Sequence, residues 1–427
     1  MKSDNEVLEI FAATKGKIEI APKVSISNRE DLSIHYTPGV AVASKEISTD
    51  KSKVFTYTGK SNNIAIITDG SRVLGLGNVG PEAALPVMEG KALLFKKYGG
   101  VDAVPICLSF QDEESIVKVA KAIEPVFGAF NIEDIESPKC FRIVDRLSKM
   151  LEIPVLHDDR HGTAMVVTAG LMNALKLSGK RLEDSKIVIN GAGAAGLGIA
   201  QMLLAAGAKR LYLVDRTGII YEGRQEGMNE FKQEIARSTN KEKISGSLKD
   251  AAKGADVLIG VSEAGAFTEE VIKGMNDKPI VFALANPVPE ISYDDAKRAG
   301  AFIVATGRSD FPNQVNNVLG FPSIMRGLLD ARATKVDYEM LLEGAKALAK
   351  ATGAELGVEH ILPTPYSMRE TLKVLTKVSV AIARSAVRSG NSRLKELDEK
   401  AMRSNATAMI KKVAKMEKLA ARQLQKQ

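Results

Sequence analysis

The 427-residue chain is predicted to be an α/β protein. We expect an N-terminal α/β domain on a mostly parallel sheet, then a Rossmann-type dinucleotide-binding domain and C-terminal helices. Three observations predict this class. Short apolar runs alternate with helical segments, a glycine-rich stretch joins one such run to a helix, and the chain is too long for one ordinary core. The expected segments are 1–160, 161–335, 336–390 and a basic helical tail at 391–427.

The composition excludes several classes of protein. The two cysteines, Cys107 and Cys140, have no CxxC spacing, which fits a reducing compartment rather than a disulfide framework. No apolar run is long enough to span a membrane, and the first residues lack the apolar core of a signal peptide. We therefore expect a cytoplasmic protein. The net charge of +7 suits an acidic substrate or nucleic acid and does not decide between them.

The N-terminal segment ends in a fixed turn. Residues 1–35 are expected to form helix and loop, and Pro38-Gly39 then enforces a turn directly after Tyr36. A tyrosine held at such a point can serve as a general acid near a reacting carbon. The alternative is a turn residue that only packs its ring.

Two strands are expected at 54–58 and 63–68, followed by a glycine-rich loop. Residues 75–80, GLGNVG, have the G-x-G-x-x-G spacing of a dinucleotide loop. We reject that role, because the next strand, 102–108, carries its acid at its start, where the acid could not reach a ribose. Arg72 is a candidate for binding a substrate carboxylate and is otherwise a surface arginine.

A helix is expected at 81–98, with Pro81 at its tolerated first position, and it carries Lys91. The neighbours of Lys91 one turn away are apolar: Val87, Met88, Leu94 and Phe95. A lysine on such a face either extends its amine to water or is desolvated. If Lys91 is desolvated, its pKa falls and it can act as a base near neutral pH.

Two pairs of acids follow neighbouring strands. The expected strands and helices of this region are 102–108, 113–122, 128–132, 138–150, 154–157 and 163–177. Glu133 and Asp134 follow the second of these strands, and Asp158 and Asp159 follow the third. Parallel strands place their carboxyl ends at one edge of the sheet, so four carboxylates would converge there and would need a cation. Two ordinary acidic loops are the alternative.

The strongest pattern in the chain is a dinucleotide loop. A strand at 186–190 leads into Gly191, Ala192, Gly193, Ala194, Ala195 and Gly196, and a helix is expected at 199–206. Small residues let backbone N–H groups approach a pyrophosphate. The next strand, 211–214, ends in Asp215, where the ribose needs an acid. Asp215 should repel a 2′-phosphate whereas Arg216 could pair with one, so NAD and NADP both remain open.

Polar side chains follow later strands too. These strands are expected at 256–261, 279–284 and 301–305. Asn286, held extended before Pro287, and Asn317 offer amides that suit substrate oxygens or the nicotinamide, with turn chemistry as the alternative.

The last part of the chain is expected to be helical. Helices are expected from 321 to about 390, and from about 392 an amphipathic, lysine-rich helix follows. We interpret this tail as an interaction or oligomer helix, with RNA or an acidic surface as its alternative ligand.

Together these stretches resemble malic enzyme in its compact prokaryotic form. They run in family order from about 35 to 325: HYTPGVA, TDGSRVLGLGNVG, MEGKALLFK, FNIEDIESP, VLHDDRHGTA, INGAGAAGLGIA, ALANP and ATGRSDFPNQVNNVLGFP. The resemblance implies oxidative decarboxylation of L-malate to pyruvate, with NAD or NADP and Mg²⁺ or Mn²⁺ as cofactors. It also implies a homodimer. From the sequence itself we expect no membrane or nucleic-acid partner. The basic tail is not part of the family pattern.

The resemblance assigns roles to the residues singled out above. It implies that Tyr36 is the general acid and Lys91 the general base. It implies that Asp158 is a catalytic-site acid. It implies metal ligands at Glu133, Asp134 and Asp159. It implies substrate or cofactor positions at Arg72, Asn286 and Asn317.

Three alternatives remain open. Malolactic enzyme shares these stretches, but it keeps NAD bound and releases lactate. A related dehydrogenase of amino or hydroxy acids has no use for four carboxylates, because metal-free hydride transfer does not need them. A dinucleotide-sensing or nucleic-acid-binding protein would leave Lys91 and the acid pairs unexplained.

Overall fold

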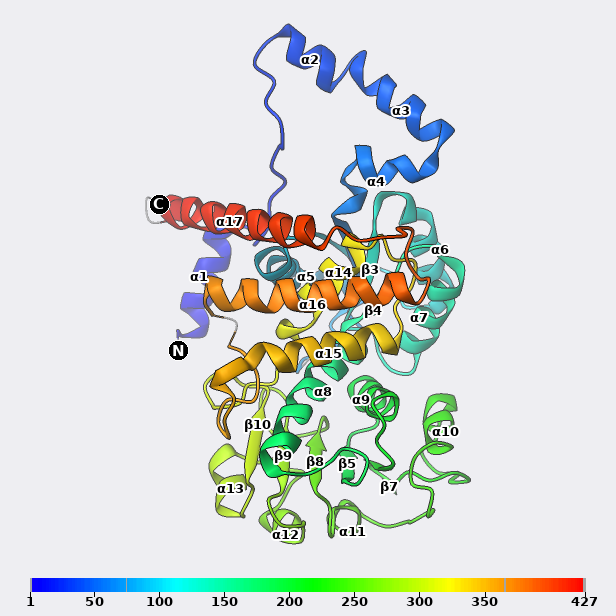
Figure 1. Ribbon diagram of the computed structural model, residues 1–427, viewed down its shortest axis with the longest axis vertical. Coiled ribbons are helices and arrows are strands. Elements are labelled where there is room, and N and C mark those ends of the chain that lie inside the picture. The colour runs from blue at the N-terminus through cyan, green and yellow to red at the C-terminus, as the bar shows by residue number, and fades with distance from the viewer. Residues whose placement is uncertain (1, 74, 365, 425–427) are drawn as a thin grey trace.

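The computed structural model describes residues 2–73, 75–364 and 366–424, and it contains two α/β units and a set of C-terminal helices (Figure 1). Within this described part, a four-stranded sheet has the order β2-β1-β3-β4, and a six-stranded sheet has the order β10-β9-β8-β5-β6-β7. The α/β class is confirmed.

All strands of the first sheet are parallel: β1 (Asn63–Thr68), β2 (Asp102–Cys107), β3 (Ala129–Ile132) and β4 (Val155–His157). The helices that follow the first three strands are α5 (Gly80–Gly99), α6 (Glu113–Ile123) and α7 (Lys139–Met150). In the register of the sheet, Ile132 lies between Ile67 and His157. The residues that follow β1, β3 and β4 are therefore brought to one edge.

The second sheet is parallel except for its edge strand. Its strands are β5 (Lys186–Asn190), β6 (Arg210–Asp215), β7 (Gly218–Ile219), β8 (Val257–Gly260), β9 (Ile280–Ala283) and β10 (Ile303–Thr306), with β7 antiparallel to β6. Its helices are α9 (Ala194–Ala205), α10 (Glu230–Ala236), α11 (Leu248–Ala252), α12 (Glu269–Lys273) and α13 (Tyr293–Arg298). The largely buried α8 (Asp158–Ser178) joins the two sheets.

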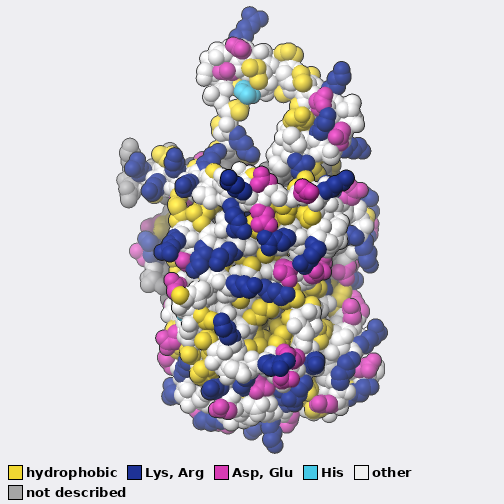
Figure 2. Space-filling view, in the orientation of Figure 1, with side chains coloured by type: hydrophobic (Ala, Val, Ile, Leu, Met, Phe, Trp, Pro, Cys, Tyr) yellow, Lys and Arg dark blue, Asp and Glu magenta, His cyan; other side chains and the backbone are white. Residues whose placement is uncertain are grey.

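The C-terminal helices form one helical layer that packs on both α/β units (Figure 1). They are α14 (Phe321–Asp330), α15 (Tyr338–Thr352), α16 (Met368–Arg388) and α17 (Glu399–Leu424). Helix α17 buries Met402, Ala406, Ile410 and Val413, and Figure 2 shows basic side chains gathered over this helical layer. The tail is therefore amphipathic, as expected. Among the described residues, no helix combines the length and apolar character of a membrane span.

The N-terminal segment forms an arm that projects from the body of the molecule (Figure 1). Helix α1 (Asp4–Thr14) lies near the body, whereas α2 (Arg29–His35) and α3 (Gly39–Thr49) project from it and bury no residue. The short α4 (Val54–Tyr57) returns the chain to β1. The strand expected at 54–58 is therefore wrong. The run VFTYT is β-prone, but it has no neighbouring strand to pair with at this point.

Short 3₁₀ turns complete the structure: η1 (Lys51–Lys53), η2 (Gly59–Ser61), η3 (Glu124–Val126), η4 (Asn317–Leu319) and η5 (Gly353–Glu355).

Candidate active site

The two acid pairs converge, as the strand order predicts. Glu133 and Asp134 follow β3, and Asp158 and Asp159 form the first turn of α8. One carboxylate oxygen from each of Glu133, Asp134 and Asp159 lies within 4.8 Å of the others. Helix α8 begins at the acids rather than at residue 163, because negative charge is favourable at the positive end of a helix dipole.

Lys91 reaches this cluster from α5 and is desolvated. Its side chain is 9 % exposed, and its Nζ lies 2.5 Å from Asp158 Oδ2 and 2.8 Å from Glu133 Oε1. The ammonium also lies 4.2 Å from the ring centroid of Phe321. The lysine therefore does not extend its amine to water, and it belongs to the site.

The pKa of Lys91 shifts in the direction opposite to the one predicted from its apolar neighbours. Burial alone would lower the pKa of Lys91, but the charges of Asp158 and Glu133 outweigh burial and raise it above its usual value. Burial also raises the pKa of Asp158 to about 8 and raises that of Glu133, with Lys91 opposing both shifts. All three groups hold their protons more tightly than usual, as expected where carboxylates outnumber cations.

The neighbours of the cluster fix its geometry. Asn131 Nδ2 donates to Glu133 Oε2 at 2.7 Å, and His157 Nε2 lies 3.6 Å from Asp159 Oδ2. Burial would raise the pKa of Asp159, but His157 keeps that pKa below its ordinary value. Asp134 has a positive φ of 50°, a conformation that often marks functional sites. Sequence reasoning missed Asn131 and His157, because each is an ordinary buried residue of its strand.

Two observations indicate that the residues of the site fit a divalent cation. Three oxygen donors converge, and oxygen ligands are those that Mg²⁺ and Mn²⁺ prefer. The buried Asp158 Oδ1 has no hydrogen-bond partner among the described residues. Space for this oxygen depends on Gly162, since a Cβ there would lie 1.8 Å from Asp158 Oδ1.

The candidate substrate residues lie at different distances from the cluster. Asn317 Nδ2 donates to Asp158 Oδ2 at 2.5 Å, so this amide is part of the site. Arg72 is exposed, and its backbone N–H donates to the carbonyl oxygen of Asp134 at 3.0 Å. Asn286 is exposed after β9, and its Nδ2 donates to the carbonyl oxygen of Leu284 at 3.3 Å.

The dinucleotide loop has the expected geometry between β5 and α9. Gly191 has a φ of 116°, and a Cβ on Gly196 would lie 1.7 Å from the Gly191 carbonyl oxygen, so both positions require glycine. The N-terminus of α9, beginning at Ala194, has no side-chain cap. Its backbone N–H groups can therefore face a pyrophosphate, as the spacing of the small residues predicts.

Asp215, the acid expected to bind the ribose, is held by two basic residues that sequence reasoning missed. Arg224 pairs with both oxygens of Asp215, and Lys232 Nζ lies 2.7 Å from Asp215 Oδ2. Burial opposes the shift, but these cations hold the pKa of Asp215 far below its usual value. By contrast, the Arg216 side chain is 92 % exposed. Neither partner lies in the glycine-rich pattern, so no motif pointed to them.

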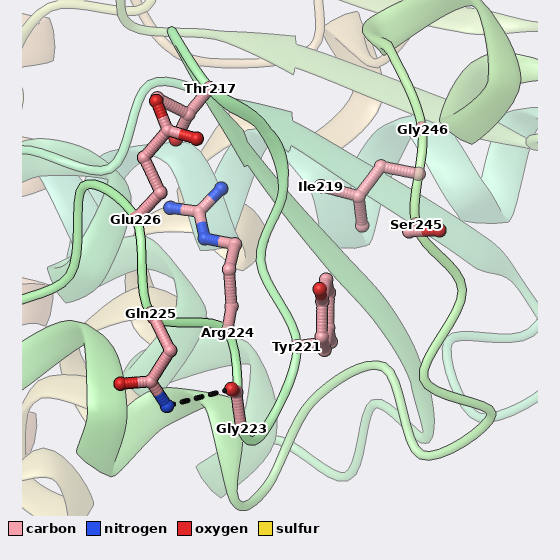
Figure 3. Close-up of a pocket in the computed structure, with 9 residues that line it drawn as sticks. All are labelled: Thr217, Ile219, Tyr221, Gly223, Arg224, Gln225, Glu226, Ser245 and Gly246. Carbon is pink, nitrogen blue, oxygen red and sulfur yellow. Dashed lines mark hydrogen bonds between the residues drawn. The ribbon is translucent and has the colours of Figure 1, made fainter.

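A hollow of about 350 Å³ adjoins this strand end and is lined by Thr217, Tyr221, Arg224 and Ser245 among others. Figure 3 shows the guanidinium of Arg224 directed toward Thr217 and Glu226, while Gln225 turns back to the carbonyl oxygen of Gly223.

Tyr36 is the one expected catalytic residue that lies apart from the cluster. It caps α2 on the projecting arm, and it is 65 % exposed. Figure 1 shows α2 and α3, the helices on either side of Tyr36, projecting away from α5, the helix that carries Lys91.

Comparison with known proteins identifies the family. The family model described as malic enzyme, NAD binding domain matches residues 161–387, and the one described as malic enzyme, N-terminal domain matches residues 15–118. The chain belongs to the malic enzyme family. It is therefore an enzyme that uses NAD or NADP, as the resemblance implied.

Individual relatives agree with this assignment. The chain is 51 % identical to the bifunctional malic/malolactic enzyme of Bacillus subtilis, over 92 % of this chain and 95 % of that one. It is 49 % identical to the NAD-dependent malic enzyme of Geobacillus stearothermophilus, over 88 % and 78 %. Other relatives are named NADP-dependent malic enzymes. The solved malic enzyme of Pyrococcus horikoshii superposes with a TM-score of 0.91 at 45 % identity, over 96 % and 95 % of the two chains.

Proposed function

We propose that the protein oxidises and decarboxylates L-malate to pyruvate and CO₂, with reduction of NAD or NADP and a requirement for Mg²⁺ or Mn²⁺. One observation carries the proposal. The buried Lys91 ammonium lies against Glu133 and Asp158, beside the three carboxylates that approach within 4.8 Å. A base next to a divalent-metal site is the arrangement that oxidation of a hydroxy acid followed by decarboxylation needs.

Glu133, Asp134 and Asp159 would hold the metal ion. When bound, the ion supplies positive charge that stabilises negative charge developing on substrate oxygens. The raised pKa values of Asp158 and Glu133 support this assignment, because burial first and neighbouring carboxylates second raise them, and a bound cation would offset both effects.

The residues of the chain would handle the protons. Lys91 would act in its neutral amine form, because a cation that offsets the neighbouring carboxylates would remove the charge that raises its pKa. The amine would take the proton from the C2 hydroxyl while the hydride leaves C2 for the nicotinamide. Lys91 and Asn317 both donate to Asp158 Oδ2, so Asp158 and Asn317 would hold the Lys91 side chain in position. Arg72 binds a substrate carboxylate. After CO₂ leaves, Tyr36 protonates C3 to give pyruvate.

Tyr36 would come from a second copy of the chain. The arm that carries it exposes large apolar side chains on α2 and α3, among them Leu32, Ile34, Val40 and Val42, and Figure 2 shows apolar atoms on this arm. Such a surface is costly in water and marks an interface. A two-fold dimer in which each arm reaches the other copy would cover these side chains and complete both sites.

NAD and NADP are both compatible with the ribose end of the site. Asp215 Oδ1 accepts from Thr217 and Arg224, and Oδ2 accepts from Arg224 and Lys232. The negative charge that would repel a 2′-phosphate is thus neutralised. This supports use of either cofactor.

Malolactic activity is the second candidate. The Bacillus subtilis relative, 51 % identical, is named a bifunctional malic/malolactic enzyme. The same residues could serve if the reduced cofactor stays bound and returns its hydride to the product, which would then be lactate.

Site variants test the proposal. Lys91→Ala and Asp159→Asn should each lose malate turnover by at least about 100-fold, the lower range for loss of a general base, while a fluorescence titration with NADH or NADPH still shows binding. If either variant kept most of its kcat, the assigned role would be wrong.

Mixing tests whether the site is shared. Tyr36→Phe and Lys91→Ala should each be inactive alone. After subunit exchange, a shared site predicts recovery of roughly a quarter of wild-type activity, because half of the dimers are mixed and each mixed dimer has one complete site. No recovery in mixed dimers would place Tyr36 and Lys91 of one chain in the same site.

A further inference from the structure

Lys139 makes a buried ion pair that none of the roles above uses. It is the first residue of α7, and its side chain is largely buried. Its Nζ lies 2.6 Å from Oδ2 of the fully buried Asp69, and it donates to the carbonyl oxygen of Gln111 at 2.9 Å. Asp69 follows β1, and Gln111 lies beyond β2. The Lys139 ammonium thus links the segments that follow β1, β2 and β3 of the first sheet.

A series of hydrogen bonds leads from this pair toward the metal ligands. Asp69 Oδ1 accepts from the backbone N–H of Ser71 at 2.9 Å, and Ser71 Oγ accepts from the N–H of Glu136 at 3.0 Å. The N–H of Arg72 then donates to the carbonyl oxygen of Asp134. The loop carrying Arg72 is therefore fastened to the segment carrying Glu133 and Asp134.

We propose that Lys139 and Asp69 are positioning residues that hold Arg72 beside the carboxylate cluster and so determine how tightly the chain binds the carboxylate of its substrate. This inference rests on the proposed function, because it takes Arg72 as the group that binds that carboxylate. Within the described part of the chain, the hydrogen bonds and ion pairs of Lys139 and Asp69 do not include Lys91, so the pair acts on binding of the substrate rather than on proton transfer.

Two variants that differ in buried charge can distinguish a positioning role of this pair from a purely stabilising role. Lys139→Met alone leaves the Asp69 carboxylate buried without its cation, which is strongly destabilising. Removing both charges, in Asp69→Asn/Lys139→Met, takes that penalty away, since replacement of a whole buried pair is often neutral. The double variant should recover thermal stability without recovering the position of Arg72.

Calorimetry with L-malate and the Mn²⁺-loaded full chain, without cofactor, tests the inference. We expect Lys139→Met and the double variant to bind malate about tenfold more weakly, the factor that 1.4 kcal/mol corresponds to. The same Lys139→Met change should have little further effect in an Arg72→Ala background, because residues that act through one another are not additive. Lys118→Met, an exposed lysine on α6, is the control and should bind malate normally.

Three results would overturn the inference: unchanged malate affinity in both Lys139 variants, an undiminished effect in the Arg72→Ala background, or recovery of affinity together with melting temperature in the double variant. If Lys139→Met fails to fold, the double variant still provides the test, because it contains no buried unpaired charge at this position. Wild-type protein that binds no malate would overturn the proposed function as well. Wild-type protein that oxidises malate, with unaffected variants, would overturn this inference alone.

Discussion

Replacing Lys91 with alanine should affect both catalysis and stability. The variant removes the ammonium that lies 2.5 Å from Asp158 and 2.8 Å from Glu133. Loss of a general base reduces turnover by about 10²- to 10⁴-fold. Removal of one partner from a buried ion pair costs roughly 3–5 kcal/mol, because the remaining charges are uncompensated.

The stability loss should depend on pH and on metal. In the variant, burial and mutual repulsion raise the pKa values of Asp158 and Glu133 further above their unfolded values, because Lys91 no longer opposes these shifts. A raised carboxyl pKa means that the folded state binds more protons, so stability is present at low pH and falls as the pH rises above about 4. Mn²⁺ should stabilise the variant more than the wild type, since the site has lost its own cation.

The assay is thermal unfolding from pH 5 to 8 with and without Mn²⁺, together with kcat for malate. Lys97→Ala is the control, because Lys97 is on the same helix but pairs with Glu417 at the surface, where an ion pair contributes about 0–1 kcal/mol. The reasoning would be refuted if Lys91→Ala melted like Lys97→Ala at every pH, or kept more than about a tenth of its turnover.

Three further outcomes concern the dinucleotide domain. Gly196→Ala should abolish NADH and NADPH binding in a fluorescence titration, because its Cβ would lie 1.7 Å from the Gly191 carbonyl oxygen, and unchanged affinity would contradict the assigned loop. Lys232→Gln should weaken NADPH binding more than NADH binding, because Asp215 regains negative charge near a 2′-phosphate, and equal changes would contradict this reading. The pKa of Asp215 is lowered in the fold, so its pairing contributes stability above about pH 4 that is lost as the pH falls, and Asp215→Asn should flatten the acid limb of an unfolding profile.

Much of the fold and the core of the site could be predicted from the sequence. Alternating apolar runs and helical segments fix a parallel sheet, and parallel strands bring their carboxyl ends together. This is why Glu133, Asp134 and Asp159 could be expected to meet. The glycine requirements at Gly191 and Gly196 follow from local backbone geometry, which spacing alone encodes.

What could not be predicted depends on contacts between distant segments. The pKa of Lys91 rises rather than falls, because two carboxylates reach it from other elements, and periodicity showed only its apolar neighbours. Arg224 and Lys232 reach Asp215 from a loop and a helix with no recognisable spacing. Residues 54–57 are helical although β-prone, because strand formation needs a partner strand.

The measurement that tests the central claim most directly is a stoichiometric assay of malate turnover. Purified protein is mixed with L-malate, Mn²⁺ and either NAD or NADP, and reduced nicotinamide, pyruvate and lactate are followed together. The account predicts one pyruvate for each reduced cofactor, with both lost on adding a chelator and restored by excess Mn²⁺. Turnover that persists in the chelator would contradict the metal site. Lactate without net reduction would assign malolactic activity instead, and no turnover with either cofactor would contradict malate as the substrate.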